Sequence, residues 1–138
     1  MSGRFCLFRL CRAGALAAVV VGQGQGLPLV RLQPLRDHFA AHPEFLQPEV
    51  RRNEILRLIE GGLVDISVSR AGQAWGIPLP FDAASVVYVW FDALINYASA
   101  VGLGGDAAMF ERWWPADLHV VGKDITRFHA VIWPAMLM

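Results

Sequence analysis

The residues with the clearest chemical potential lie in one segment, 122–129, which reads GKDITRFH. This segment follows a short apolar run, and in open α/β sheets ligands bind beyond the carboxyl ends of such strands. Gly122 has no side chain, so a flat ligand could approach the backbone there. The carboxylate of Asp124 could accept both hydroxyls of a ribose, or it could cap a following helix by accepting its first N–H groups. The spacing alone favours the cap.

Apolar and aromatic side chains follow Asp124 at helical spacing and share one helix face. They are Ile125, Phe128, His129, Ile132 and Trp133. A histidine in such a stripe is usually a satisfied core residue, but it could also be the single polar group of an apolar pocket. Trp90 and Tyr97 could form a second wall, although aromatic residues in this pattern are more often core than ligand-binding.

Two strand-to-helix units must position these side chains. Residues 86–91 form an apolar, β-rich run that Trp90 closes, and Asp92 is placed to cap the helix that follows. Residues 118–121 form a second strand, followed by a helix in which Pro134 should produce a kink. The order strand, helix, strand, helix predicts parallel pairing with helices across the sheet, and therefore an α/β fold.

The preceding part of the chain is predicted to be mostly helical. Residues 29–46 and 48–60 have helical periodicity, and two glycines end the second helix. Residues 65–70 alternate like a short strand, and residues 75–80 form an extended connector because each proline disfavours helix before it. We expect the arginines of the second helix to form its solvated face. They are Arg51, Arg52 and Arg57.

Composition sets broad limits on function. The 138 residues carry 12 basic and 12 acidic side chains, so bulk charge gives no argument for nucleic-acid binding. Hydrophobic residues make up 55% of the chain, yet no uninterrupted apolar run is long enough to predict a membrane span. Cys6 and Cys11 are predicted to be free thiols, because a structural zinc site needs four ligands. His38 and His42 are spaced for a metal but lack a third ligand, so no metal site is predicted.

The first 28 residues fit the rest of the chain poorly. Arginines precede a small apolar run within residues 1–21, which is the layout of a targeting peptide, but sequence foreign to the fold is the favoured interpretation. The glycine-rich stretch 22–28 lacks the residues of a phosphate loop.

The chain resembles the catalytic core of the methionyl-tRNA synthetases over residues 29–138. The resemblance is carried by VYVWFDALINY (87–97), WWPADLHVVGKDITRFHAVIWPAML (113–137), PEFLQPEVRRNEILRLIEGGLVDISVSR (43–70) and WGIPLP (75–80). It implies a partial Rossmann-like parallel sheet, formed by residues 76–138 as the second half of the nucleotide-binding fold. Residues 29–75 would then be the end of the connective insertion, and residues 1–28 a segment outside the family.

The same resemblance implies a methionine pocket and a ribose corner. The positions that match the family's methionine-binding residues are Trp90, Ala93, Leu94, Tyr97, Ile125, His129 and Trp133. Leu94 departs from some members, which carry proline there. Gly122 and Asp124 match residues that meet the ribose of ATP. A thioether is a soft, weak acceptor, so methionine must be recognised by an aromatic slot with one weak polar contact.

The implied activity is methionine–tRNA ligation through methionyl-adenylate, with ATP, Mg²⁺ and the initiator and elongator methionine tRNAs as partners, in the cytoplasm. The family's His-Ile-Gly-His and Lys-Met-Ser-Lys-Ser segments and its zinc-binding cysteines are not found in the sequence, and Lys123 is its one lysine. We therefore assign no catalytic residue, and expect a fragment that needs the rest of the synthetase and is inactive alone. The alternatives are a small methionine- or nucleoside-binding module and one half of a split enzyme.

Overall fold

The structure is a computed structural model that describes residues 5–8, 32–63 and 67–138. Most of the targeting-like segment, the glycine-rich stretch, Cys11 and the start of the strand predicted at 65–70 lie outside these residues. Residues 5–8 of the targeting-like segment are described and form a strand. Among the residues inside them, no helix is both long and apolar enough to cross a membrane.

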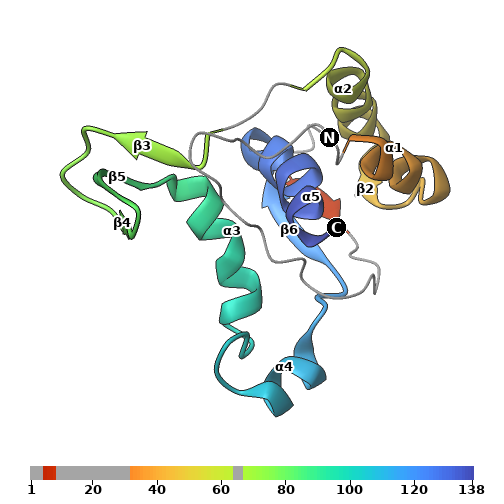
Figure 1. Cartoon of the computed structure of the whole chain (residues 1–138). Helices are drawn as coiled ribbons and strands as arrows, with labels where there is room; N and C mark the ends of the chain where they lie inside the picture. Colours follow the sequence, from red (N-terminus) through yellow and green to blue (C-terminus); the bar gives the residue numbers. More distant parts are fainter. Residues whose placement is uncertain (1–4, 9–31, 64–66) are drawn as a thin grey trace.

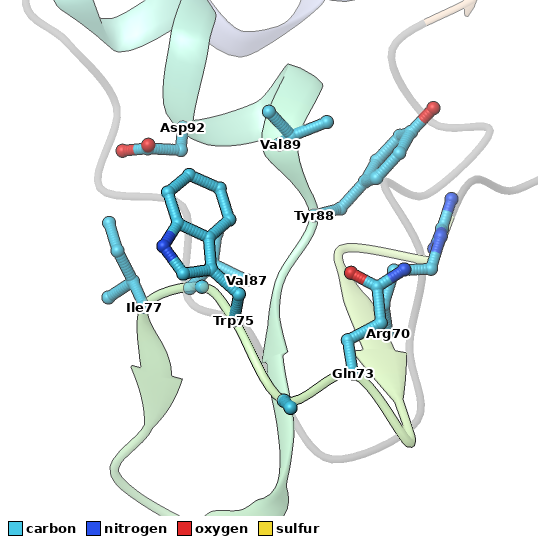
Figure 2. Close-up of a pocket in the computed structure, with 10 residues that line it drawn as sticks. Arg70, Gln73, Trp75, Ile77, Val87, Tyr88, Val89 and Asp92 are labelled. Atoms are coloured by element: carbon cyan, nitrogen blue, oxygen red, sulfur yellow. The ribbon is translucent and has the colours of Figure 1, made fainter.

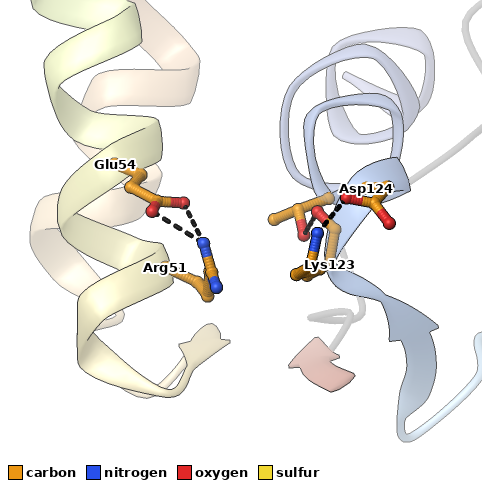
Figure 3. Close-up of polar contacts among 5 residues, drawn as sticks. Arg51, Glu54, Lys123 and Asp124 are labelled. Atoms are coloured by element: carbon orange, nitrogen blue, oxygen red, sulfur yellow. Dashed lines mark hydrogen bonds and ion pairs between the residues drawn. The ribbon is translucent and has the colours of Figure 1, made fainter. Parts of the chain in front are cut away.

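Both predicted N-terminal helices are confirmed, as α1 (Leu32–Ala41) and α2 (Glu49–Glu60). Their apolar faces meet, and Gly62 follows α2 with a φ of 89°, a conformation that glycine adopts without steric cost. The prediction that all three arginines of α2 form a solvated face is wrong for Arg52. Its Nη2 donates a hydrogen bond across to α1, to the Phe39 carbonyl, at 3.1 Å. Arg51 instead pairs along its own helix with Glu54, at 2.7 and 2.8 Å (Figure 3).

Within the described residues, six short strands form two separate antiparallel sheets. One has the order β2-β1-β6, from Leu46–Gln47, Phe5–Phe8 and His119–Gly122. The other has the order β3-β5-β4, from Ser69–Ala71, Asp82–Val87 and Pro78–Leu79. The predicted parallel pairing is not observed, because β5 and β6 lie in different sheets. A short turn is enough to join β4 to β5 in an antiparallel pair, whereas a parallel pair needs a long crossover.

The first strand-to-helix unit passes from strand to helix earlier in the sequence than predicted. β5 ends at Val87 and α3 (Val89–Ser99) begins two residues later, so Trp90 lies in the first turn of the helix and does not close a strand. Tyr88 is the N-cap residue, and the predicted cap at Asp92 is wrong. Asp92 instead lies in the first turn, where the helix dipole favours a carboxylate. A short helix, α4 (Ala107–Trp113), then leads to β6.

The second unit is not one continuous helix. After β6 come a 3₁₀ turn η2 (Lys123–Ile125), a π-helical turn η3 (Phe128–Ile132) and the α-helix α5 (Trp133–Leu137). Pro134 lies in the first turn of α5, where its missing N–H is tolerated, directly after the wide turn. π-Helical turns often occur at functional sites.

Two apolar clusters hold these elements together. The first lies between α1, α2, β6 and η3, and its largest fully buried members are Phe39 and Phe45. The second lies between α3, η3 and α5, around Leu94 and Trp133. In Figure 1, α5 and β6 lie centrally, with α1 and α2 on one side and α3 with the β3-β5-β4 sheet on the other. The C-terminal segment therefore contributes to both clusters.

Candidate functional site

A partly buried hydrogen bond joins the two strand-to-helix units. The hydroxyl of Tyr97 on α3 lies 2.7 Å from Nε2 of His129 in the π-helical turn. The other ring nitrogen, Nδ1, lies 3.0 Å from the backbone carbonyl of Ile125. The contact spans 32 residues of sequence, so it depends on how α3 packs against η3.

The bonding pattern fixes the tautomer of this histidine. A carbonyl oxygen only accepts, so Nδ1 of His129 must carry the proton that it donates to Ile125. Burial lowers the pKa of His129 and keeps the ring neutral, although the bond to Ile125 opposes this shift. Nε2 is then an acceptor, and the Tyr97 hydroxyl donates to it. The oxygen of Tyr97 keeps its lone pairs for a further contact.

Two buried polar atoms beside this pair lack a partner among the residues that the structure describes. They are Nε1 of Trp133, whose side chain is 1% exposed, and Nε2 of His119. The ring of Tyr97 lies 4.7 Å from that of His119 and 6.1 Å from that of Trp133, centroid to centroid. An unsatisfied buried polar group costs about 1–3 kcal/mol, so these two atoms are polar groups held in the core at a cost in stability.

Sequence reasoning did not include His119 or Phe128 in the site. Strand alternation is the signal that could have found His119, because His119 and Val121 are buried on one face of β6 while Val120 points outward. Phe128 stacks on Trp90, with ring centroids 4.1 Å apart and planes inclined by 12°. Trp90 thus contacts the residue that precedes His129.

The other predicted methionine residues differ in their surroundings. Leu94 is fully buried in the second apolar cluster, and Ala93, its neighbour on α3, is exposed. The side chain of Ile125 packs against the first apolar cluster, while its carbonyl holds His129. The structure therefore brings Leu94, Tyr97, His129 and Trp133 into one region, with Trp90 beside it through Phe128.

The predicted ribose corner lies where β6 turns into η2. Gly122 is the N-cap residue of η2 with a φ of −66°, which any residue can adopt, and a Cβ built there would meet nothing within 4 Å. Neither backbone conformation nor packing within the described chain explains a glycine here. The cap predicted for Asp124 is wrong, since its carboxylate accepts from the Lys123 ammonium (Figure 3) and is 83% exposed. The Asp124 carboxylate faces solvent, and no side chain covers the neighbouring backbone at Gly122.

The described ranges contain no group of three or more His, Cys, Asp or Glu side chains that could hold a metal ion.

Comparisons with known proteins show which family the chain is similar to. The family model of tRNA synthetases class I (M) matches residues 27–138. The methionine–tRNA ligase of Thermotoga maritima is 54% identical over 112 residues, which are 78% of this chain and 18% of the relative. The enzyme of the same name from Streptomyces coelicolor is 54% identical over 106 residues, 77% of this chain and 20% of the relative. The chain thus spans about a fifth of the length of these relatives.

A solved structure shows the same likeness in three dimensions. It is a crystal structure of Mycobacterium tuberculosis methionyl-tRNA synthetase bound by methionyl-adenylate, with a TM-score of 0.72 and 46% identity. The match covers 79% of this chain and 22% of that protein. The apo form of the same synthetase gives a TM-score of 0.71.

Proposed function

The chain belongs to the class I tRNA synthetases of the methionyl type, and from this premise we propose that it forms one wall of a methionine–tRNA ligase catalytic centre. The activity of the complete enzyme is the ATP-dependent attachment of methionine to its initiator and elongator tRNAs through methionyl-adenylate, in the cytoplasm. The observation that carries the proposal is the Tyr97–His129 hydrogen bond beside the unpartnered indole N–H of Trp133.

We propose that the methionine side chain lies against Trp90, Tyr97, His129 and Trp133, with Ala93, Leu94 and Ile125 completing the wall. Aromatic rings give favourable contacts to a thioether, with sulfur about 5 Å from the ring. The hydroxyl proton of Tyr97 is committed to His129, so the polar contact to sulfur is weak. Discrimination then depends on shape, at about 1–3 kcal/mol for each methylene-sized difference.

We propose that the ribose of ATP lies at the Gly122–Asp124 corner. The exposed carboxylate of Asp124 can accept from two ribose hydroxyls, and the absent side chain of Gly122 leaves space for the sugar beside it. Mg²⁺ would enter with the phosphates of ATP, whose oxygens are the ligands that this ion prefers. When bound, the ion would stabilise charge on the phosphate oxygens.

The remaining expectations concern the complete catalytic core and belong to the same proposal. β6 would be one strand of a Rossmann-like parallel sheet formed by residues 76–138 and the rest of the synthetase. Residues 29–75 would end the connective insertion, and the family's zinc site would lie elsewhere in that insertion. The segments that act on the phosphates would also come from other parts of the enzyme.

Methionine binding to the 138-residue chain tests the methionine wall. We expect methionine to shift the indole ¹⁵N–¹H signals of Trp90 and Trp133, and we expect His129→Ala to abolish these shifts. The matched control is His38→Ala, which changes a histidine on α1 and should leave them intact. Equal shifts in wild-type protein and His129→Ala would contradict the proposal.

Two further readouts address the nucleotide side. Gly122→Ala should leave the melting temperature unchanged, because a Cβ there meets no atom, yet weaken binding of a methionyl-adenylate analogue. The polypeptide alone should not catalyse methionine-dependent pyrophosphate exchange, since one lysine cannot form the two-lysine loop. Robust exchange, or a glycine variant with unchanged affinity, would contradict these expectations.

A further inference from the structure

Two neighbouring tryptophans at the end of α4 have different surroundings. Trp113 is 57% exposed, and its ring centroid lies 5.0 Å from the guanidinium carbon of Arg112. Trp114, the next residue, is partly buried and packs against the second apolar cluster, which contains Trp133. Of the two, Trp114 is therefore the one that reaches the proposed methionine wall.

The ring of Trp114 meets that of Trp133 edge-to-face. The two centroids are 5.9 Å apart, and the planes are inclined by 76°. Phe110 of α4 stacks on Trp114, with centroids 5.6 Å apart and planes inclined by 12°. Trp133 in turn lies 6.1 Å from the ring of Tyr97. Favourable aromatic pairs have centroids about 4.5–7 Å apart, so these contacts link α4 to the Tyr97–His129 pair through a buried indole.

A tight turn fixes the start of α4 near the end of α3. Gly102 donates to the Ser99 carbonyl at 3.1 Å, and it has a φ of 109°. A Cβ on Gly102 would lie 2.3 Å from the carbonyl oxygen of Asp106, so only glycine permits this approach. The side chain of Asp106 caps α4 by accepting from the Met109 N–H at 3.0 Å. The aromatic residues of α4 therefore follow from a defined starting point.

The backbone at Trp114 explains why the two tryptophans diverge. Proline disfavours helix in the residue before it, and Pro115 follows Trp114. Trp114 has an extended conformation, with a φ of −99° and a ψ of 142°, although its N–H still donates to the Phe110 carbonyl at 2.8 Å. The helix thus ends at Trp113, and the next side chain leaves the helical direction toward the second cluster.

The packing around Trp133 limits where its indole can move. Its side chain is 1% exposed, and a ring this buried can move only into space that its neighbours leave. Trp114 fills that space on the side of α4, with Phe110 stacked on it. A substrate side chain longer than that of methionine would have to displace the Trp133 indole, and Trp114 opposes this movement.

We propose that Trp114 is a positioning residue that sets the length of the substrate side chain by holding the Trp133 indole in place. The inference rests on the proposed function, in which Trp133 contacts the thioether of methionine. The substrates that Trp114 disfavours are the longer S-alkyl homologues of methionine. Ethionine, which has one more methylene group, is the simplest of them. Trp114 itself acts through Trp133 and not by contact with the substrate.

The first test follows the tryptophan indole ¹⁵N–¹H signals of the 138-residue chain without ligand. Trp114→Leu removes the ring current beside Trp133, so the Trp133 signal should move, whereas Trp113→Leu should leave it in place. The internal reference is Trp75, whose indole is 87% exposed and faces Asp92 at the start of α3 (Figure 2). A Trp133 signal that Trp114→Leu leaves unmoved would overturn the proposal.

The second test titrates methionine and ethionine into the same chain and compares their dissociation constants. An apolar pocket distinguishes a one-methylene difference by about 10–200-fold, so the wild-type chain should prefer methionine by about tenfold or more. Trp114→Leu should lower this preference by about fivefold, because the Trp133 indole can then move toward α4. Trp114→Phe should restore part of the preference, and Trp113→Leu should leave it unchanged.

The ratio of the two dissociation constants separates positioning from stability. A variant that only populates the folded state less would lose affinity for both amino acids by the same factor, so its ratio would not change. An unchanged ratio in Trp114→Leu, or equal changes in Trp114→Leu and Trp113→Leu, would overturn this inference and leave the proposed function standing. A wild-type chain that binds no methionine would contradict the proposed function, and this inference would fall with it.

Discussion

The two buried clusters differ in what they enclose. The cluster between α1, α2 and β6 is apolar, and the unpartnered Nε atoms of Arg36 and Arg52 at its edge belong to guanidinium groups that already bond through Nη2. The cluster between α3, η3 and α5 adjoins a tyrosine–histidine hydrogen bond and leaves the one polar atom of Trp133 without a partner in the described chain. The difference teaches that the first cluster is a purely apolar core, whereas the second adjoins buried polar atoms, one pair of which is hydrogen-bonded.

The largest effect is expected in the apolar cluster. Phe39 is 0% exposed and packs edge-on against Phe45, with ring centroids 5.1 Å apart. Phe39→Ala should lower the free energy of unfolding by about 3–5 kcal/mol, because it removes buried area and leaves a cavity. Circular dichroism during urea unfolding measures this loss in the free energy of unfolding. Val50→Ala, at a 59% exposed position of α2, is the control, and equal small losses in both variants would break the comparison.

A smaller effect is expected at the polar pair. Tyr97→Phe removes the donor to His129 Nε2 and should lower the free energy of unfolding by about 1–3 kcal/mol. In a His129→Leu background the same change should cost almost nothing, because the acceptor is gone. A double-mutant cycle measures this coupling, and additive losses would show that the hydrogen bond does not contribute.

The smallest effect is the pH dependence of stability. Burial lowers the pKa of His119 and His129 below the ordinary value of 6.5, and His129 further lowers that of His119. The unfolded chain therefore binds protons first, and stability falls as pH drops through about 6.5, by up to about 1.4 kcal/mol per pH unit for each histidine.

Two substitutions locate the source of this slope. His119→Leu should flatten it, whereas His38→Leu should change it less, because His38 is only partly buried and Glu44 opposes its shift. Unfolding free energies measured at several pH values check this expectation, and a slope that His119→Leu leaves unchanged would contradict it.

The sequence by itself determined the family and the two N-terminal helices. The strings at 87–97 and 113–137 predicted a methionyl-tRNA synthetase, which the comparisons confirm. Apolar periodicity predicted α1 and α2, because helical faces repeat along a single stretch of chain. The stripe from Ile125 to Trp133 predicted one shared helix face; His129 and Trp133 are both buried, but Ile125 packs against the first cluster and Trp133 belongs to the second.

Tertiary structure decided the features that depend on residues far apart in sequence. Strand pairing was one, since β5 and β6 each took antiparallel partners that periodicity does not specify. The Tyr97–His129 hydrogen bond was another. Packing also left the Trp133 nitrogen without a partner among the described residues and brought Gly76 close to Val86 of β5. Periodicity reports which face of an element is apolar, but only packing fixes which polar atoms meet and which are buried without a partner among the described residues.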